Sequence, residues 1–217
     1  MPIASVTVNA NIGGISAGGT LQRSATGQIS HEVSVAAGLS GELDGMDSAG
    51  TAGTVDNLDS GHAVAEGDIV NVFAAAAESD GTRKVRHSIP VDSADATSFT
   101  FDDVSAGDAG GAALPTADDT AVVVSEFGTE IDSDFDGDDV LAFVVSADQP
   151  CVVQFQEGDG TVVGTIVLAK ASEPFVWIKD QGIANPLAGN AVGKIKVANG
   201  GTSAATVKIG ILYDSDE

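Results

Sequence analysis

Apolar and polar residues alternate along several short stretches of the chain. In the segment QISHEVSV, the residues assigned to a common face are Ile29, His31, Val33 and Val35. In KVRHSIPV they are Val85, His87, Ile89 and Val91. A period of two is typical of strands buried on one face, and the spacing of an amphipathic helix is hard to find anywhere. The sequence therefore predicts an all-β protein.

Three further segments are apolar at consecutive positions, which is typical of strands buried on both faces. They are TAVVVSEF (120–127), VLAFVV (140–145) and PFVWIKD (174–180). The last contains the only tryptophan, Trp177, which we place in a central strand. A domain of this size buries one face of each strand easily, so the second faces need a cover or a neighbouring subunit.

The region from about residue 44 to 128 differs from its flanks in composition. It holds 16 of the 32 acidic residues, and it contains five strand-like runs near 54–58, 68–75, 84–91, 97–101 and 120–127. Five short strands suit a small barrel of the SH3 or OB type. We expect its core to contain Ile69, Phe73, Val85, Ile89, Phe99, Phe101 and Val123.

The N-terminal 43 residues supply too few strands to be stable alone, so they should pair with strands from the C-terminal part. The predicted fold is an antiparallel, jelly-roll-like β-sandwich made of residues 1–43 and 129–217. The small barrel, residues 44–128, is inserted into it.

The net charge of −23 argues against binding to nucleic acid, because an acidic surface repels phosphate backbones. The single cysteine, Cys151, heads an apolar run and is interpreted as a buried hydrophobic residue. The N-terminal segment lacks a basic start and a continuous apolar run, so no secretion signal is expected. No apolar run is long enough to span a membrane.

The segment IDSDFDGDDVLAF (131–143) resembles the start of an EF-hand calcium loop. Aspartates occupy the first, third, fifth and seventh loop positions, and glycine the sixth. The twelfth position is Phe143, which cannot coordinate a cation, and the residues after it read as a strand. We interpret the segment as an acidic turn and expect no metal or cofactor. The weak metal-ligand candidates are Asp132, Asp134, Asp136 and Asp138.

Other candidate chemistry is sparse. The segment GISAG fits the pattern of a hydrolase nucleophile elbow around Ser16, but the continuation GTLQRSATG is not helical, so a glycine-rich hairpin is favoured. The three histidines, His31, His62 and His87, show no metal-ligand spacing. The basic cluster of Arg83, Lys84 and Arg86 is expected to pair with acidic groups. The long loop DQGIANPLAGNAVG (180–193) is a candidate ordered contact loop.

Three segments together resemble small virion structural proteins of tailed bacteriophages, of the head-decoration type. They are GQISHEVSVAAGLSGEL, FDGDDVLAFVVSADQ and the ending NPLAGN…KIKVANGGTSAATVKIGILYD. The resemblance covers the N-terminal 43 and the C-terminal 90 or so residues. It implies a non-enzymatic β protein that coats a capsid, contacts the major capsid or other virion proteins, and is often a trimer. Its location would be the virion, assembled in the host cytoplasm, without contact to nucleic acid or membrane.

Two other function classes stay open. The chain could be a surface adhesin or a tail-associated module that binds a receptor or a carbohydrate. It could also be an enzyme such as a hydrolase using Ser16, for which the structural context of the motif is missing. The virion protein is the leading hypothesis, and a symmetric homo-oligomer, a trimer first, is expected.

Overall fold

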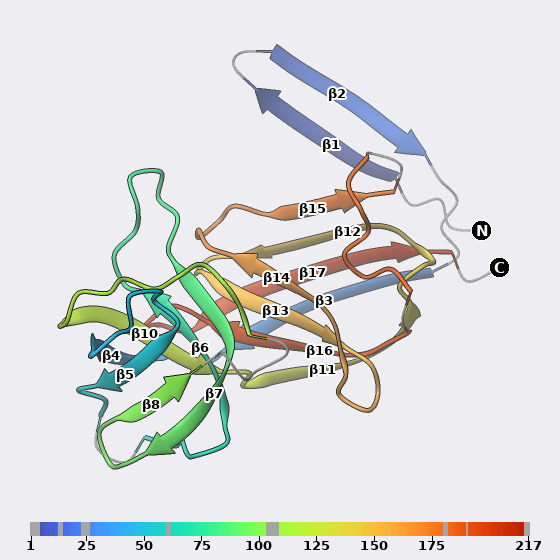
Figure 1. The fold of residues 1–217 in the computed structure, drawn as a ribbon. Helices are drawn as coiled ribbons and strands as arrows, with labels where there is room; N and C mark the ends of the chain where they lie inside the picture. Colours follow the sequence, from blue (N-terminus) through green and yellow to red (C-terminus); the bar gives the residue numbers. More distant parts are fainter. Residues whose placement is uncertain are drawn as a thin grey trace.

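The computed structural model describes residues 5–12, 15–22, 27–59, 62–102, 109–179, 182–189 and 191–214, the first two ranges as backbone only. These residues form strands and turns: a closed antiparallel barrel, two open antiparallel sheets and a separate hairpin (Figure 1). The all-β prediction is confirmed. Within the described ranges, no helix is long and apolar enough to cross a bilayer.

Eight strands form the two open sheets, which face each other as a sandwich. They are β3 (Gly27–Val35), β11 (Thr129–Asp136), β12 (Val140–Ala147), β13 (Cys151–Gln156), β14 (Val162–Leu168), β15 (Phe175–Ile178), β16 (Ala191–Asn199) and β17 (Ala205–Tyr213). One sheet has the order β15-β12-β17-β3 and the other β11-β16-β13-β14. The shared core includes Phe143, Phe155, Trp177 and Ile195.

The pairing of these eight strands is that of a jelly roll. In chain order, the first strand pairs with the eighth (β3–β17), the second with the seventh (β11–β16), the third with the sixth (β12–β15), and the fourth with the fifth (β13–β14). The chain thus behaves as one long hairpin rolled into two sheets.

Between the first and second strands of the jelly roll, the chain makes the barrel. Its strands are β4 (Leu39–Asp44), β5 (Ala52–Asp56), β6 (Ile69–Ala74), β7 (Val85–Ala94), β8 (Phe99–Asp102) and β10 (Thr120–Glu126), with β9 (Gly110–Gly111) added beside β7. The pairing of β6 with β7 closes the ring.

The structure corrects the predicted start of the barrel. Residues 39–44, assigned from the sequence to the sandwich, form β4, which pairs with β5 and β10 in the barrel. Its Leu43 is fully buried in the barrel core. The barrel therefore has six strands where the sequence indicated five, because only three residues, 36–38, separate β4 from the sandwich strand β3 and no change in composition marks the crossing.

The predicted barrel core divides into three parts. Ile89, Phe99 and Phe101 lie in the barrel core. A second set, Phe73, Val85 and Val123, packs instead against Val152 and Ala198 of the sandwich. Ile69 is 44% exposed and belongs to neither. We call the cluster of Phe73, Val85, Val123, Val152 and Ala198 the seam.

The alternation predicted for residues 84–91 is interrupted. His87 and Ser88 together face Asn71 of β6, since the register shifts between Val70 and Val72, and Ser88 has a positive φ of 57°. Such a bulge reverses the side-chain phase. Val85 before the bulge therefore faces the seam, whereas Ile89 after it faces the barrel core.

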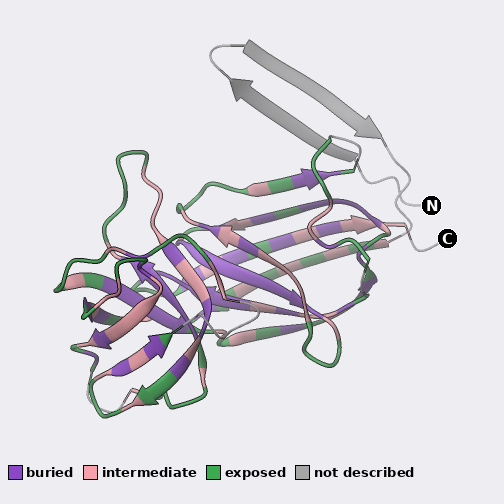
Figure 2. Cartoon of the chain, viewed as in Figure 1, coloured by how far each residue is buried: buried purple, intermediate pink, exposed green. Residues whose placement is uncertain are grey.

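Buried polar groups also join the two parts at the bulge. Asn71, fully buried, accepts a hydrogen bond from the Ser88 amide (3.2 Å) and donates to the Ser125 carbonyl (3.1 Å). From the sandwich, Gln154 donates to the Ser88 hydroxyl (3.1 Å). β13 is consequently buried along its whole length, between the sandwich core and the barrel (Figure 2).

The hairpin consists of β1 (Ser5–Ile12) and β2 (Ile15–Gln22), paired with each other in antiparallel register. Among the described strands, neither pairs with any other. The expectation that the N-terminal part pairs with C-terminal strands therefore holds for β3, which pairs with β17, but not for β1 and β2.

Candidate contact surface

The barrel packs against part of the outer face of the β11-β16-β13-β14 sheet, and its described residues do not pack against the outer face of the other sheet. On that other sheet, Val144 lies opposite both Val176 and Gly210, and Ala142 lies opposite both Ile178 and Leu212. Residues directly opposite each other share a face of a sheet. We call these six residues, Ala142, Val144, Val176, Ile178, Gly210 and Leu212, the outer patch.

The outer patch is apolar and partly exposed to solvent. Val144 is 39% and Val176 42% exposed, whereas large apolar side chains elsewhere on the described strands are mostly buried. The next row along the sheet is polar and contains the Lys208–Glu32 ion pair (3.1 Å). The patch thus has a defined polar boundary.

Aromatic side chains pack on the inner side of the sheet, behind the patch. Phe143 stacks on Phe175 and on Trp177, with ring centroids 5.5 and 5.9 Å apart, and meets Phe155 at 6.1 Å. The sequence places Trp177 in a central strand, but the structure places it in β15, an edge strand. Its outward neighbour Val176 is exposed, since none of the strands 27–214 that the structure describes with side chains covers it.

The predicted contact loop follows β15 and is held by specific bonds over residues 182–189. The Trp177 Nε1 donates to the Ile183 carbonyl (3.1 Å), and the Asn185 side chain donates to the Gly137 carbonyl (2.8 Å). Leu187 anchors the loop in the sandwich core. Ile183 is held in place by these contacts, yet its own side chain is 64% exposed.

One aspartate of the segment 131–143, Asp138, bonds to this loop, and Asp136 bonds within its own turn. Asp136 accepts a hydrogen bond from the Asp138 amide (2.9 Å), and Asp138 accepts one from the Gly189 amide (2.8 Å). The segment forms the end of β11 and the turn into β12, and the side chains of Asp132 and Asp134 are exposed. Among the described residues, no group of three or more acidic, histidine or cysteine side chains is placed to hold a metal.

The other candidate residues belong to different elements of the fold. Ser16 lies within β2, in strand–turn–strand surroundings rather than at the strand-to-helix turn of a nucleophile elbow. His31 belongs to β3, His62 to the β5–β6 connection and His87 to the bulge. Burial, and secondarily the Arg86 charge, lowers the pKa of His87.

Cys151 lies at the start of β13 with no exposed surface. Burial in the apolar core raises the pKa of its thiol to about 12, and the nearby Asp148 charge adds to this. Because the thiolate is the reactive form, the thiol is inert at neutral pH.

The basic cluster binds groups within the chain. Arg83 donates from its guanidinium to the Gly200 carbonyl (3.2 Å) across the seam, and Arg86 donates to the Gly111 carbonyl (3.1 Å). Lys84 pairs with Glu78 at 3.8 Å. These cations thus help to hold the barrel and its connection to the sandwich.

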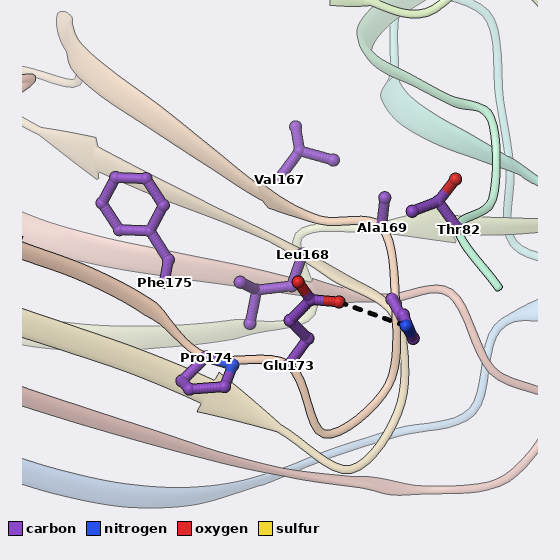
Figure 3. A pocket seen from close by; sticks show the side chains of 8 residues that line it. Thr82, Val167, Leu168, Ala169, Glu173, Pro174 and Phe175 are labelled. Atoms are coloured by element: carbon purple, nitrogen blue, oxygen red, sulfur yellow. Dashed lines mark ion pairs between the residues drawn. The ribbon is translucent and has the colours of Figure 1, made fainter. Parts of the chain in front are cut away.

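A cavity of about 230 Å³ lies beside the seam (Figure 3). Thr82 of the barrel lines one side, and Phe175 and Pro174 of the sandwich line another. Lys170 and Glu173 form an ion pair at 3.5 Å on its wall. The cavity is smaller than the roughly 300–1,000 Å³ typical of ligand pockets.

Comparison with known proteins adds no relative to this picture. The chain matches no protein-family model, and no curated protein and no solved structure is significantly similar to it.

Proposed function

We propose that the protein is a structural component of a virus particle, most specifically a decoration protein on the outside of a tailed-virus head. The observation that carries the proposal is the jelly-roll pairing of β3 and β11–β17, an arrangement used by viral capsid domains. The resemblance of the N-terminal and C-terminal segments to virion proteins points the same way.

The contacts between the barrel and the sandwich at the seam support the proposal. A coat protein must carry load as one block, and the barrel and sandwich share both an apolar cluster and the Gln154–Ser88 hydrogen bond. Interfaces between loosely tethered domains are usually more polar and permit relative motion. The fully buried ring of Phe73 is typical of a rigid connection.

Charge supports an external position. A chain with a net charge of −23 is repelled by packaged nucleic acid and by other particles. Contacts with capsid neighbours would then use the uncharged surfaces: the outer patch and the exposed Ile183.

Jelly rolls also occur in lectins, so carbohydrate binding is the alternative that needs comparison. Sugar sites commonly use exposed aromatic rings as platforms. In the described part of the chain, Trp177 is only 4% exposed and Tyr213 packs partly buried against the sandwich core. This favours a structural role over an adhesin or receptor-binding module.

The test is to count and locate the protein in purified particles from its source. Quantitative mass spectrometry should give a copy number on the scale of the capsid shell, and cryo-EM should place the jelly roll on the outer head surface. A handful of copies at the tail tip would indicate the receptor-binding alternative, and absence from particles would refute the proposal.

A further inference from the structure

A short strap of residues 110–112 lies over the bulge of β7. In the ladder between β9 and β7, Gly110 pairs with His87 and Gly111 pairs with Arg86. The Arg86 guanidinium also donates a hydrogen bond to the Gly111 carbonyl (3.1 Å). The strap is thus attached to β7 at the bulge, where buried polar groups join the barrel to the sandwich.

The strap lies directly against the His87 ring because two of its residues are glycines. A Cβ on Gly110 would be 2.9 Å from the ring Cε1 and 3.0 Å from Nε2, too close for a side chain to fit without a shift. Gly111 has a φ of +98°, and a Cβ there would collide with the Val85 carbonyl oxygen. That oxygen accepts a hydrogen bond from the Ala112 amide (2.9 Å). The Nε2 side of the ring is therefore covered by strap backbone.

The other side of the ring meets a chain of buried hydrogen bonds. Gln156 Nε2 donates to Gln154 Oε1 (2.6 Å), and Gln154 Nε2 donates to the Ser88 hydroxyl (3.1 Å). All three side chains are buried. Because the Ser88 oxygen accepts from Gln154, the hydroxyl has its own hydrogen to donate, and His87 Nδ1 lies 3.3 Å away as its acceptor. The hydrogen-bond directions thus favour a neutral ring with its proton on Nε2.

The groups around the ring disfavour its protonated form. Protonation would place a hydrogen on Nδ1, opposite the hydrogen of the neighbouring serine hydroxyl. The strap is uncharged, β6 and β13 face the site with the amides of Asn71 and Gln154, and β7 adds the positive Arg86. Beyond Gln154 on the sandwich sheet, Lys196 is paired with Glu130 (3.6 Å). Among these described neighbours, the negative charge of Glu130 is thus already balanced.

This environment sets the direction in which His87 responds to pH. Burial, and secondarily the Arg86 charge, lowers the pKa of His87 below its ordinary value of 6.5. The folded chain therefore binds fewer protons at this ring than the unfolded chain does. The stability that comes from the neutral ring is fully present above the unfolded-state pKa, and it is lost as the pH falls through the folded-state pKa.

We propose that His87 makes the strap an acid-sensitive switch: when the ring takes up a proton, the strap separates from β7. A half-buried imidazolium without a negative partner must gain water. On the inner side, Ser88 and Gln154 are each 3% exposed and belong to the junction with the sandwich. On the outer side, the strap pairs through a two-residue strand, and Gly111 is exposed. Separation of the strap is therefore the least costly way to hydrate the ring, and it uncovers the bulge at which barrel and sandwich meet.

An NMR titration of the isotope-labelled full chain from pH 8 to pH 5 tests the proposal. The His87 ring and the Ala112 amide should titrate together, with one midpoint below 6.5. After correction for the intrinsic pH dependence of hydrogen exchange, the protection of the Ala112 amide should fall at least about tenfold across this range. Protonation of His87 with an unchanged Ala112 amide overturns the proposal. So does unfolding of the whole chain before His87 titrates.

His87→Asn removes the titration and keeps a side-chain oxygen as acceptor for the Ser88 hydroxyl. In this variant the Ala112 amide should stay protected at pH 5. His31→Asn, at a half-buried position of β3, is the matched control, and its strap should open with the pH dependence of the parent chain. A strap that opens in H87N as it does in the parent chain, or one that no longer opens in H31N, overturns the proposal.

Gly110→Ala tests the contact between the strap and the His87 ring without acid. The added Cβ would lie 2.9 Å from the ring, so the protection of the Ala112 amide should already be reduced at least about tenfold at pH 7.5. Gly128→Ala is the matched control, because a Cβ there meets nothing within 4 Å. Equal protection in G110A and the parent chain overturns the proposal. All of these measurements use the purified chain, so their outcome is independent of whether the protein is found in particles.

Discussion

Replacing Phe73 by alanine tests whether the barrel and the sandwich are one folding unit. The Phe73 side chain comes from barrel strand β6 and is fully buried at the seam, against Val152 and Ala198 of the sandwich. Its ring also lies directly against Gly200, where an added Cβ would collide with it. Glycine has no side chain that could move into the space left by the ring.

The expected loss follows from these contacts. Removing a fully buried phenylalanine ring costs about 3–5 kcal/mol when the site cannot collapse. For a chain of this size, that corresponds to a fall in Tm of about 10 °C. Ile69→Ala on the same strand is the matched control, because Ile69 is 44% exposed and its loss should cost under about 1 kcal/mol.

Equilibrium unfolding in urea, followed by two probes, is the assay. Trp177, the only tryptophan, reports on the sandwich alone, whereas far-ultraviolet circular dichroism reports on all strands. If the seam couples the two parts, Phe73→Ala shifts both transitions together and lowers the free energy measured at Trp177 by the full amount. An unchanged Trp177 transition beside a separate early circular-dichroism transition would refute the coupling.

Three further predictions concern polar groups. Asn71→Ala leaves the Ser88 amide and the Ser125 carbonyl unpaired in a buried site, so thermal unfolding should show a loss of roughly 2–4 kcal/mol; a loss below about 0.5 kcal/mol contradicts this. Burial, together with the Asp68 charge, raises the pKa of Glu126 above its ordinary value. The fold is therefore more stable with Glu126 protonated than with it ionised: this stability is fully present below the unfolded-state pKa and is lost as the pH rises through the folded-state pKa. Glu126→Gln should therefore raise Tm at pH 7 but not at pH 4, and an equal gain at both contradicts the linkage. EDTA should leave Tm nearly unchanged, since Asp136 and Asp138 bond to backbone amides; a fall of more than about 10 °C would indicate a structural calcium site.

The sequence by itself determined the strands. The period-two pattern of β3 appears in the structure as alternating half-buried and exposed residues, and the five runs predicted between residues 44 and 128 are all strands. These features are local, since backbone preference and alternation act over a few residues. The calcium-loop pattern is local as well: Asp132–Asp138 fit it, but Phe143 at the twelfth position cannot bind a cation.

Only the tertiary structure decided which strand pairs with which and what covers each face. A strand such as β4 carries no local mark of its partner, so its place in the barrel came from long-range pairing with β10. The bulge at Ser88 turned Val85 toward the sandwich because one extra residue reverses the phase of everything before it. The apolar second face of β10 is covered by the seam, whereas that of β12 and β15 is left open. The sequence shows equal hydrophobicity in both cases, and the difference arises because the barrel can cover only one side of the sandwich.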